Sequence, residues 1–141
     1  MRIDVSGIKV SGLPQGLGGS SGRLLWTRDS KMQMTPLGSG TVGGDVVEWT
    51  PNSANGKLSL IATFDRVGDA SFKKKEYDFK VQVRVDNKGG RFVTVGKCTV
   101  DLAKRYEEGE RTVSICVPVK KEFLESGEGG KITLAFDLRI V

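Results

Sequence analysis

Residues 75–86 read KEYDFKVQVRVD, and this stretch decides the fold. Apolar side chains occupy every second position from Tyr77 to Val85, and polar side chains occupy the positions between them. A period of two is typical of a β-strand with one face in the core and the other in solvent. The stretch therefore predicts a half-buried strand at 76–86 and favours an all-β fold.

Similar strand signals recur along the rest of the chain. The expected strands are 2–10, 23–28, 31–36, 40–42, 46–50, 57–66, 76–86, 92–101, 111–119 and 131–141. Short strands separated by turn residues predict a two-layer antiparallel sandwich. Asp101 precedes a run of helix formers that ends at Gly109, so we expect a short helix at 102–108 with Asp101 as its N-cap.

The composition describes one globular domain with a basic surface. The chain has 141 residues, of which 38% are hydrophobic and 28% are charged. No apolar run approaches the roughly 18 residues that a membrane-spanning helix needs, and no signal region precedes the first strand. We therefore expect a single cytoplasmic domain over 1–141 with reduced cysteines. The net charge of +5 favours anionic partners, such as lipid headgroups, acidic proteins or nucleic acid.

The residue types argue against catalysis. Histidine is absent, which removes the commonest general base and the commonest transition-metal ligand. Cys98 and Cys116 without histidine do not make a structural zinc site. The glycine-rich segment 16–22 leads into a strand, whereas a phosphate-binding loop ends in Gly-Lys-Ser/Thr and opens a helix. We therefore expect a protein that is not an enzyme and has no cofactor and no metal.

Several motifs, taken in order, resemble a known family. The strand at 76–86 is followed by GKCTVDLA at 96–103 and then by the short helical segment. Leu25-Trp26 lies in an early strand, VVEW follows at 46–49, and KITLAFDLRI closes the chain at 131–140. In these features the chain is similar to the N-terminal C2 domain family (NT-C2), the front domain of cytoplasmic membrane-trafficking and cytoskeletal adaptor proteins. The resemblance implies an eight-stranded antiparallel C2-type β-sandwich at the front of a longer protein.

The loops at one end of the expected sandwich are poor in carboxylates. Relatives that bind calcium supply several aspartates from these loops, because the ion takes six to eight oxygen ligands. The corresponding loops here are 11–22, 50–56 and 86–91, and their one carboxylate is Asp86, which lies near Lys88 and Arg91. We therefore expect a domain that works independently of calcium.

Charge and resemblance together lead to a first hypothesis, a non-catalytic targeting module that binds anionic membrane lipids and recruits a longer adaptor protein. Each Lys or Arg near an anionic leaflet contributes about 1 kcal/mol. The candidate lipid-binding residues are Lys73, Lys74, Lys75, Arg28, Lys31, Lys88 and Arg91, with Leu13 and Leu17 dipping into the interface. Two alternatives stay open: the lysine run is a solvated link, and Leu13 packs beneath its own loop.

The second hypothesis is a protein-interaction or scaffold domain that positions a cytoskeletal or coiled-coil protein without binding lipid. Met32, Met34 and Leu37 could form its surface, since methionine adapts to irregular contacts, unless these residues pack inside the sandwich. Both hypotheses place the protein peripherally at a membrane or at the cytoskeleton. Nucleic acid is not expected, because the aromatic residues fall mainly on the predicted core parity.

Overall fold

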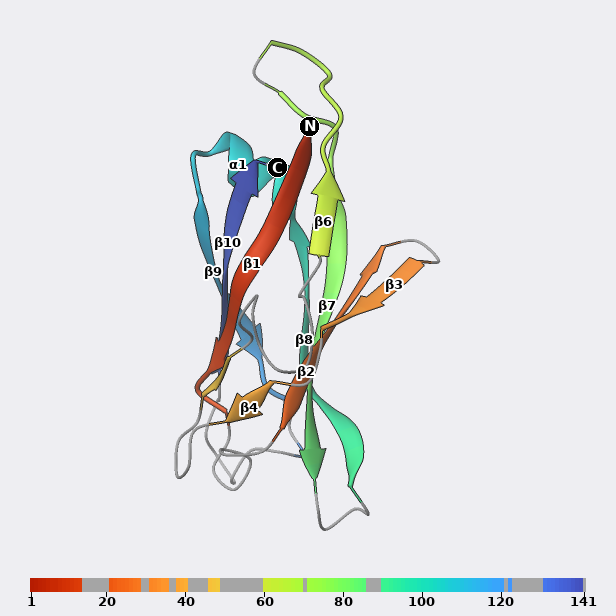
Figure 1. The fold of residues 1–141 in the computed structure, drawn as a ribbon, viewed down its shortest axis with the longest axis vertical. Coiled ribbons are helices and arrows are strands. Elements are labelled where there is room, and N and C mark those ends of the chain that lie inside the picture. Colours follow the sequence, from red (N-terminus) through yellow and green to blue (C-terminus); the bar gives the residue numbers. More distant parts are fainter. Residues whose placement is uncertain are drawn as a thin grey trace.

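The computed structural model describes residues 1–13, 21–28, 31–35, 38–40, 46–48, 60–69, 71–85, 90–120, 122 and 131–140. In this part of the chain there are ten strands and one helix (Figure 1). They are β1 (Arg2–Ser11), β2 (Gly22–Arg28), β3 (Lys31–Met34), β4 (Ser39–Gly40), β5 (Val47–Glu48), β6 (Leu60–Thr63), β7 (Glu76–Val85), β8 (Arg91–Asp101), α1 (Leu102–Glu107), β9 (Thr112–Pro118) and β10 (Lys131–Ile140).

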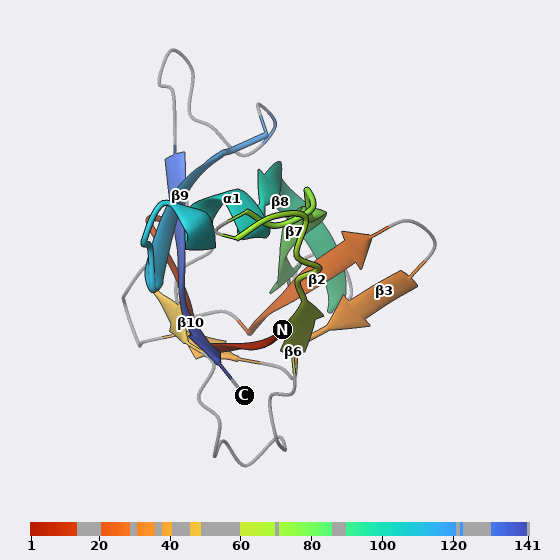
Figure 2. The ribbon, with the colours of Figure 1, turned by 90° about the horizontal axis from the view of Figure 1, so that it is seen from above.

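The strands form two antiparallel sheets that face each other (Figure 2). One sheet has the order β4-β5-β1-β10-β9, with β6 pairing to the first half of β1. The other has the order β3-β2-β7-β8. Without the two-residue strands β4 and β5, each sheet has four strands. The expected all-β antiparallel sandwich is confirmed.

The alternation in the sequence decides which side chains fill the space between the sheets. Phe79 in β7 and Phe136 in β10 are 0% and 1% exposed, and their ring centroids lie 5.9 Å apart across the two layers. Trp26 in β2 is also buried and contacts Phe79. The predicted core parity of β7 and β10 is thus confirmed; Trp49 lies outside the described residues.

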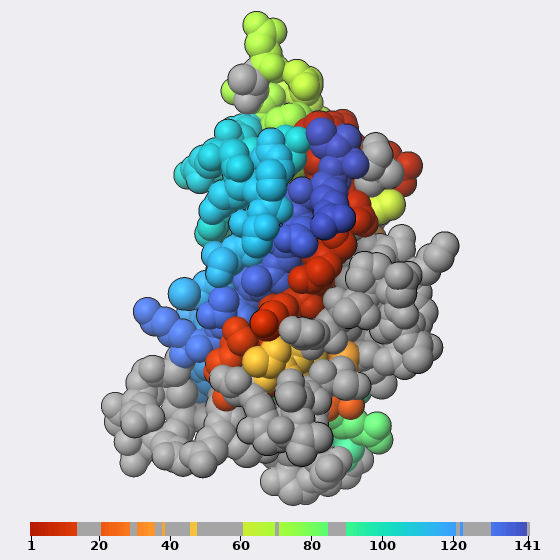
Figure 3. Space-filling model, turned by 60° about the vertical axis from the view of Figure 1, so that its left-hand side comes forward, coloured from red at the N-terminus to blue at the C-terminus, as the bar shows by residue number. Residues whose placement is uncertain are grey.

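The strand expected at 57–66 ends earlier in the structure, and its first residues, 57–59, lie outside the described part of the chain. β6 ends at Thr63, and residues 65–69 and 71–73 then form the described part of a hairpin. In this hairpin the N–H of Val67 donates to the carbonyl of Ser71, and the N–H of Lys73 donates to the carbonyl of Asp65. Figure 3 shows this hairpin in yellow-green, projecting beyond the face on which β1 and β10 lie side by side. The strand pattern of 57–66 therefore includes residues that belong to a turn.

Helix α1 begins as the sequence predicts. The Asp101 carboxylate accepts a hydrogen bond from the backbone N–H of Lys104 at 3.2 Å, which satisfies a free amide of the first turn. Leu102, Ala103 and Tyr106 are buried against the sandwich. The N-cap prediction for Asp101 is confirmed.

Gly96 lies where β8 approaches β9 of the opposite sheet. A Cβ atom at this position would lie 2.8 Å from the Pro118 carbonyl oxygen and 3.0 Å from Val117 Cγ1. We expect Gly96→Ala to lower the free energy of unfolding by about 1–3 kcal/mol, because the backbone must move apart. Gly68→Ala, which meets nothing closer than 3.8 Å, should change it by less than about 0.5 kcal/mol. If urea unfolding shows the same loss of stability for both substitutions, the close approach of β8 to β9 at Gly96 is contradicted.

The two thiols differ in exposure and should differ in reactivity. Cys98 in β8 is partly buried, and this burial raises the pKa of its thiol, with Asp78 raising it further. Cys116 in β9 is exposed. Since the thiolate is the reacting form, an aromatic disulfide reagent at pH 8 should label Cys116 first and Cys98 roughly tenfold more slowly. Cys116→Ser should remove the fast phase of labelling. If both thiols react at one rate, Cys98 is not more buried than Cys116.

Candidate functional site

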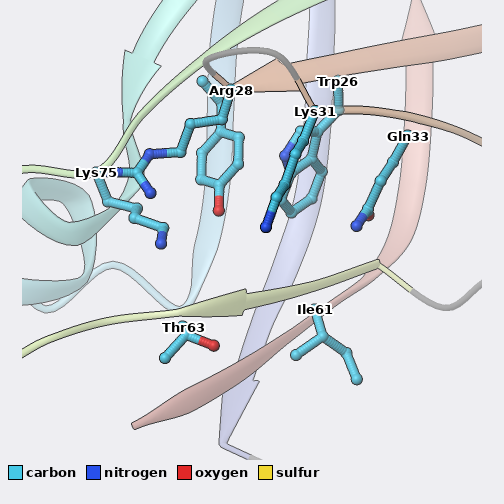
Figure 4. Close-up of a pocket in the computed structure, with 8 residues that line it drawn as sticks. Trp26, Arg28, Lys31, Gln33, Ile61, Thr63 and Lys75 are labelled. Atoms are coloured by element: carbon cyan, nitrogen blue, oxygen red, sulfur yellow. The ribbon is translucent and has the colours of Figure 1, made fainter.

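An open pocket lies between the β2–β3 hairpin and strand β6 (Figure 4). Its volume is about 370 Å³. The hairpin belongs to one sheet and β6 to the other, so the pocket opens where the edges of the two sheets face each other. The lining residues are Trp26, Arg28, Lys31, Gln33, Ile61, Thr63, Lys75 and Tyr77.

Strand register brings two cations into this pocket from the hairpin. Arg28 lies directly opposite Lys31 in the β2–β3 ladder, and Trp26 lies opposite Gln33. Residues paired in this way share a face, so all four side chains point to the same side of the sheet. Like charges directly opposite each other repel. Among the lining residues that the structure describes there are three cations and no carboxylate.

The third cation reaches the pocket from the segment just before β7. The backbone N–H of Lys75 donates to Asp101 Oδ1 at 3.1 Å, and the Lys75 carbonyl accepts from the N–H of Leu102 at 3.0 Å. The residue that caps α1 therefore also holds the backbone of a pocket residue in place. No local pattern indicates this second role, because the contact joins positions 26 apart in the chain.

Aromatic side chains support the inner end of the pocket. The rings of Trp26 and Tyr77 meet edge to face with centroids 4.4 Å apart. Burial raises the pKa of Tyr77, while the positive charge of Arg28 acts in the opposite direction. The phenol therefore remains protonated at neutral pH and can donate a hydrogen bond.

The pocket can bind an oxyanion. Arg28 supplies a planar fork of N–H donors, Lys31 and Lys75 supply ammonium groups, and Gln33 adds an amide. Figure 4 shows the side chains of Arg28, Lys31, Gln33 and Lys75 on one side of the β6 ribbon, which carries Ile61 and Thr63. Phosphate and carboxylate oxygens are the natural acceptors for such a set.

The lysine run 73–75 does not act as one unit. Lys75 lines the pocket, whereas Lys74 points elsewhere and forms an ion pair with Glu76, with 2.6 Å between Nζ and Oε1. The hydrogen bond and the charge of Glu76 raise the pKa of Lys74. Lys73 is exposed, and its backbone N–H closes the 65–73 hairpin. Of the three lysines, the pocket includes Lys75.

The remaining candidates lie elsewhere. Arg91 is exposed at the start of β8 and pairs with Val85, at the other end of a strand that spans about 30 Å. Leu13 is 5% exposed and belongs to the core, because its side chain packs between the sheets. Lys88 and Leu17 lie outside the described residues. Arg91 and Leu13 therefore do not line the pocket.

Three pocket residues had no role in the sequence analysis: Gln33, Ile61 and Thr63. Gln33 could have been identified from the sequence, because it lies two positions after Lys31 and therefore shares its face of the strand. Ile61 and Thr63 come from β6, and the sequence does not reveal that β6 lies across from the hairpin. Among the described residues, no group of three or more His, Cys, Asp or Glu side chains could hold a metal ion. No described helix is long and apolar enough to cross a membrane.

Comparison with solved structures gives the fold. A C2 domain-containing protein matches with a TM-score of 0.55 and 18% identity, covering 99% of this chain and 88% of its own. The chain has a C2-type fold. A second C2 domain structure matches with a TM-score of 0.51 and 14% identity, covering 99% of both chains. A C2 domain of a plant extended synaptotagmin 1 matches with a TM-score of 0.53 and 11% identity, covering 99% of this chain and 95% of its own.

The C2-type sandwich implied by the sequence motifs is therefore confirmed. No family model and no curated protein matches the chain. The narrower assignment to the N-terminal C2 branch stays a prediction. At identities of 11–18% the structural likeness concerns the fold, and function has to be argued from the residues of this chain.

Proposed function

We propose that this domain binds anionic phospholipid headgroups in the pocket between the β2–β3 hairpin and β6, and so recruits a longer adaptor protein to a membrane. The observation that carries the proposal is the convergence of Arg28, Lys31 and Lys75 on one open pocket of about 370 Å³. The C2-type fold adds support, because C2 domains commonly bind membranes or proteins. The domain has no catalytic role in this proposal.

The expected strength of binding follows from the charges. Each cation near an anionic leaflet contributes about 1 kcal/mol, and a guanidinium can contact a phosphate through two parallel hydrogen bonds. The three pocket cations together with exposed Lys73 therefore give weak, reversible recruitment. Added salt should weaken the binding, since Lys31 and Lys73 are exposed and Arg28 and Lys75 are only partly buried.

The proposal includes independence from calcium. The loops at 11–22, 50–56 and 86–91 carry one carboxylate in the sequence, Asp86, which is too few for an ion that takes six to eight oxygen ligands. In the pocket, protein cations contact the anion directly, so no bridging metal ion is required. Asp86 itself lies outside the described residues.

Vesicle co-sedimentation tests this function. Phosphatidylcholine vesicles with rising phosphatidylserine content are mixed with the protein at two salt concentrations, with calcium or with a chelator. We expect binding that increases with phosphatidylserine, decreases with salt and is the same in calcium and chelator. Equal binding to pure phosphatidylcholine, or binding that needs calcium, would contradict the proposal.

One observation favours a second function, the docking of a protein partner. Met32 and Met34 on β3 are 57% and 50% exposed, although large apolar side chains in a sandwich are usually covered. Both lie on a strand at the edge of its sheet. Leu37, the third residue expected at this surface, lies outside the described residues. A scaffold domain that positions a cytoskeletal or coiled-coil protein would use such a surface.

A further inference from the structure

Strand β3 (Lys31–Met34) is an open edge of its sheet. It is the terminal strand in the order β3-β2-β7-β8, and within the described residues it pairs with β2 alone. All four of its residues are exposed. Figures 1 and 2 show the β2–β3 hairpin extending sideways from the sandwich. An edge strand of this kind can accept another extended chain through backbone hydrogen bonds.

The register shows which backbone groups face outward. The N–H of Thr35 donates to the carbonyl of Leu24 at 3.0 Å. In an antiparallel pair, residues that bond to the partner strand alternate with residues whose N–H and C=O point away from it. Gln33, two positions before Thr35, is therefore also turned toward β2, while Met32 and Met34 are turned away. The backbone groups of the two methionines are the ones that a new strand would meet.

The two faces of this edge have different chemistry. Lys31 and Gln33 point into the basic pocket. Met32 and Met34 point to the other face, where Met34 lies opposite Leu25 of β2. An incoming strand would therefore meet cations on one face and an apolar row on the other.

We propose that β3 accepts an extended segment of a partner protein in which apolar residues alternate with glutamate or aspartate. Its backbone bonds to Met32 and Met34, its apolar side chains pack on these methionines, and its carboxylates face Lys31 and the other pocket cations. Backbone bonds in this mode supply affinity, and alternate side chains supply specificity. The inference rests on the proposed protein-docking function and does not depend on lipid binding.

Charge argues for an acidic partner and against a second copy of this chain. Two copies joined along β3 would bring two sets of Arg28, Lys31 and Lys75 together in a protein with a net charge of +5. Such an arrangement is repulsive, whereas an acidic segment neutralises the same groups. Short edge strands with a lysine also resist unselective strand pairing. The edge therefore discriminates between partners by charge.

A short synthetic peptide in which glutamate and valine alternate is the probe. It is titrated into the complete, ¹⁵N-labelled chain, and both the affinity and the hydrogen exchange of backbone amides are measured. We expect slower exchange at Met32 and Met34, because their outward N–H groups become bonded. A peptide of alternating lysine and valine, and one with the same glutamates and valines in two blocks, should bind at least about tenfold more weakly.

Substitutions separate backbone pairing from side-chain packing. Met32→Pro removes the outward N–H but leaves the bonds to β2, and should weaken peptide binding about tenfold while vesicle binding is unchanged. Met32→Ala, which keeps the N–H, should weaken it less. Lys31→Glu should make the chain bind the lysine peptide more tightly than the glutamate peptide. This variant supplies a second test if circular dichroism shows that the proline variant is unfolded.

Four results would overturn the inference. Absence of peptide binding removes both strand addition and the docking function behind it. Peptide binding without slower amide exchange at Met32 and Met34 leaves protein docking standing but rejects strand addition. Equal affinity for the lysine peptide rejects the acidic partner. A dimer by sedimentation that Met32→Pro dissociates assigns the edge to a second copy instead.

Discussion

Reversing the charges of Arg28 and Lys75 together, as Arg28→Glu and Lys75→Glu, should reduce binding to phosphatidylserine vesicles by at least about tenfold. Both side chains line the pocket, and each cation near an anionic surface contributes about 1 kcal/mol, so replacing two cations by two carboxylates exceeds the roughly 1.4 kcal/mol of a tenfold change. Co-sedimentation at fixed salt, with the chelator present, gives the ratio directly.

A matched control separates the pocket from the overall charge. Lys80 and Lys97 lie opposite each other on β7 and β8, both are exposed, and neither lines the pocket. Lys80→Glu with Lys97→Glu changes the net charge by the same amount and should reduce vesicle binding by less than about threefold. If both pairs reduce binding equally, the membrane is responding to net charge and the pocket has no special role.

Replacing Phe79 with alanine should lower the free energy of unfolding by about 3–5 kcal/mol. The side chain is 0% exposed, and its ring lies 5.7 Å from Trp26 in its own sheet and 5.9 Å from Phe136 in the other. The substitution removes contacts on both sides of the core and leaves a cavity. Thermal unfolding should show a decrease in Tm on the order of 10 °C or more.

Phe92→Ala is the control for the aromatic substitution. Phe92 is partly exposed near the start of β8, and its ring centroid lies 4.0 Å from the Arg23 guanidinium carbon. Removing it forfeits a cation–π contact and some packing, with an expected loss of about 1 kcal/mol. A loss as large as that of Phe79→Ala would mean that the core is not centred on Phe79.

The fold could be predicted from the sequence because its signals are local. Alternation from Tyr77 to Val83 and from Ile132 to Leu138 reflects one buried and one exposed face, and the structure buries the same parity. The N-cap at Asp101 depends on residues a few positions apart. Strand ends were less accurate, since the run expected at 57–66 stops at Thr63 and turns into a hairpin.

The site could be predicted only in part because it depends on contacts between distant segments. Lys73, Lys74 and Lys75 are neighbours in the sequence, yet an extended backbone sends alternate side chains to opposite sides, so Lys75 lines the pocket and Lys74 pairs with Glu76. Thr63 joins the pocket because two sheet edges face each other, which no local pattern reveals.

The most direct test of the central claim is a titration of soluble, short-chain phosphatidylserine into the ¹⁵N-labelled protein, followed by NMR with calcium and then with a chelator. We expect the largest amide shifts around the pocket, at Arg28, Lys31, Thr63 and Lys75, and the same shifts in both conditions. Shifts confined to the start of β8 near Arg91, or shifts that appear only with calcium, would contradict the assignment of this pocket as the lipid site.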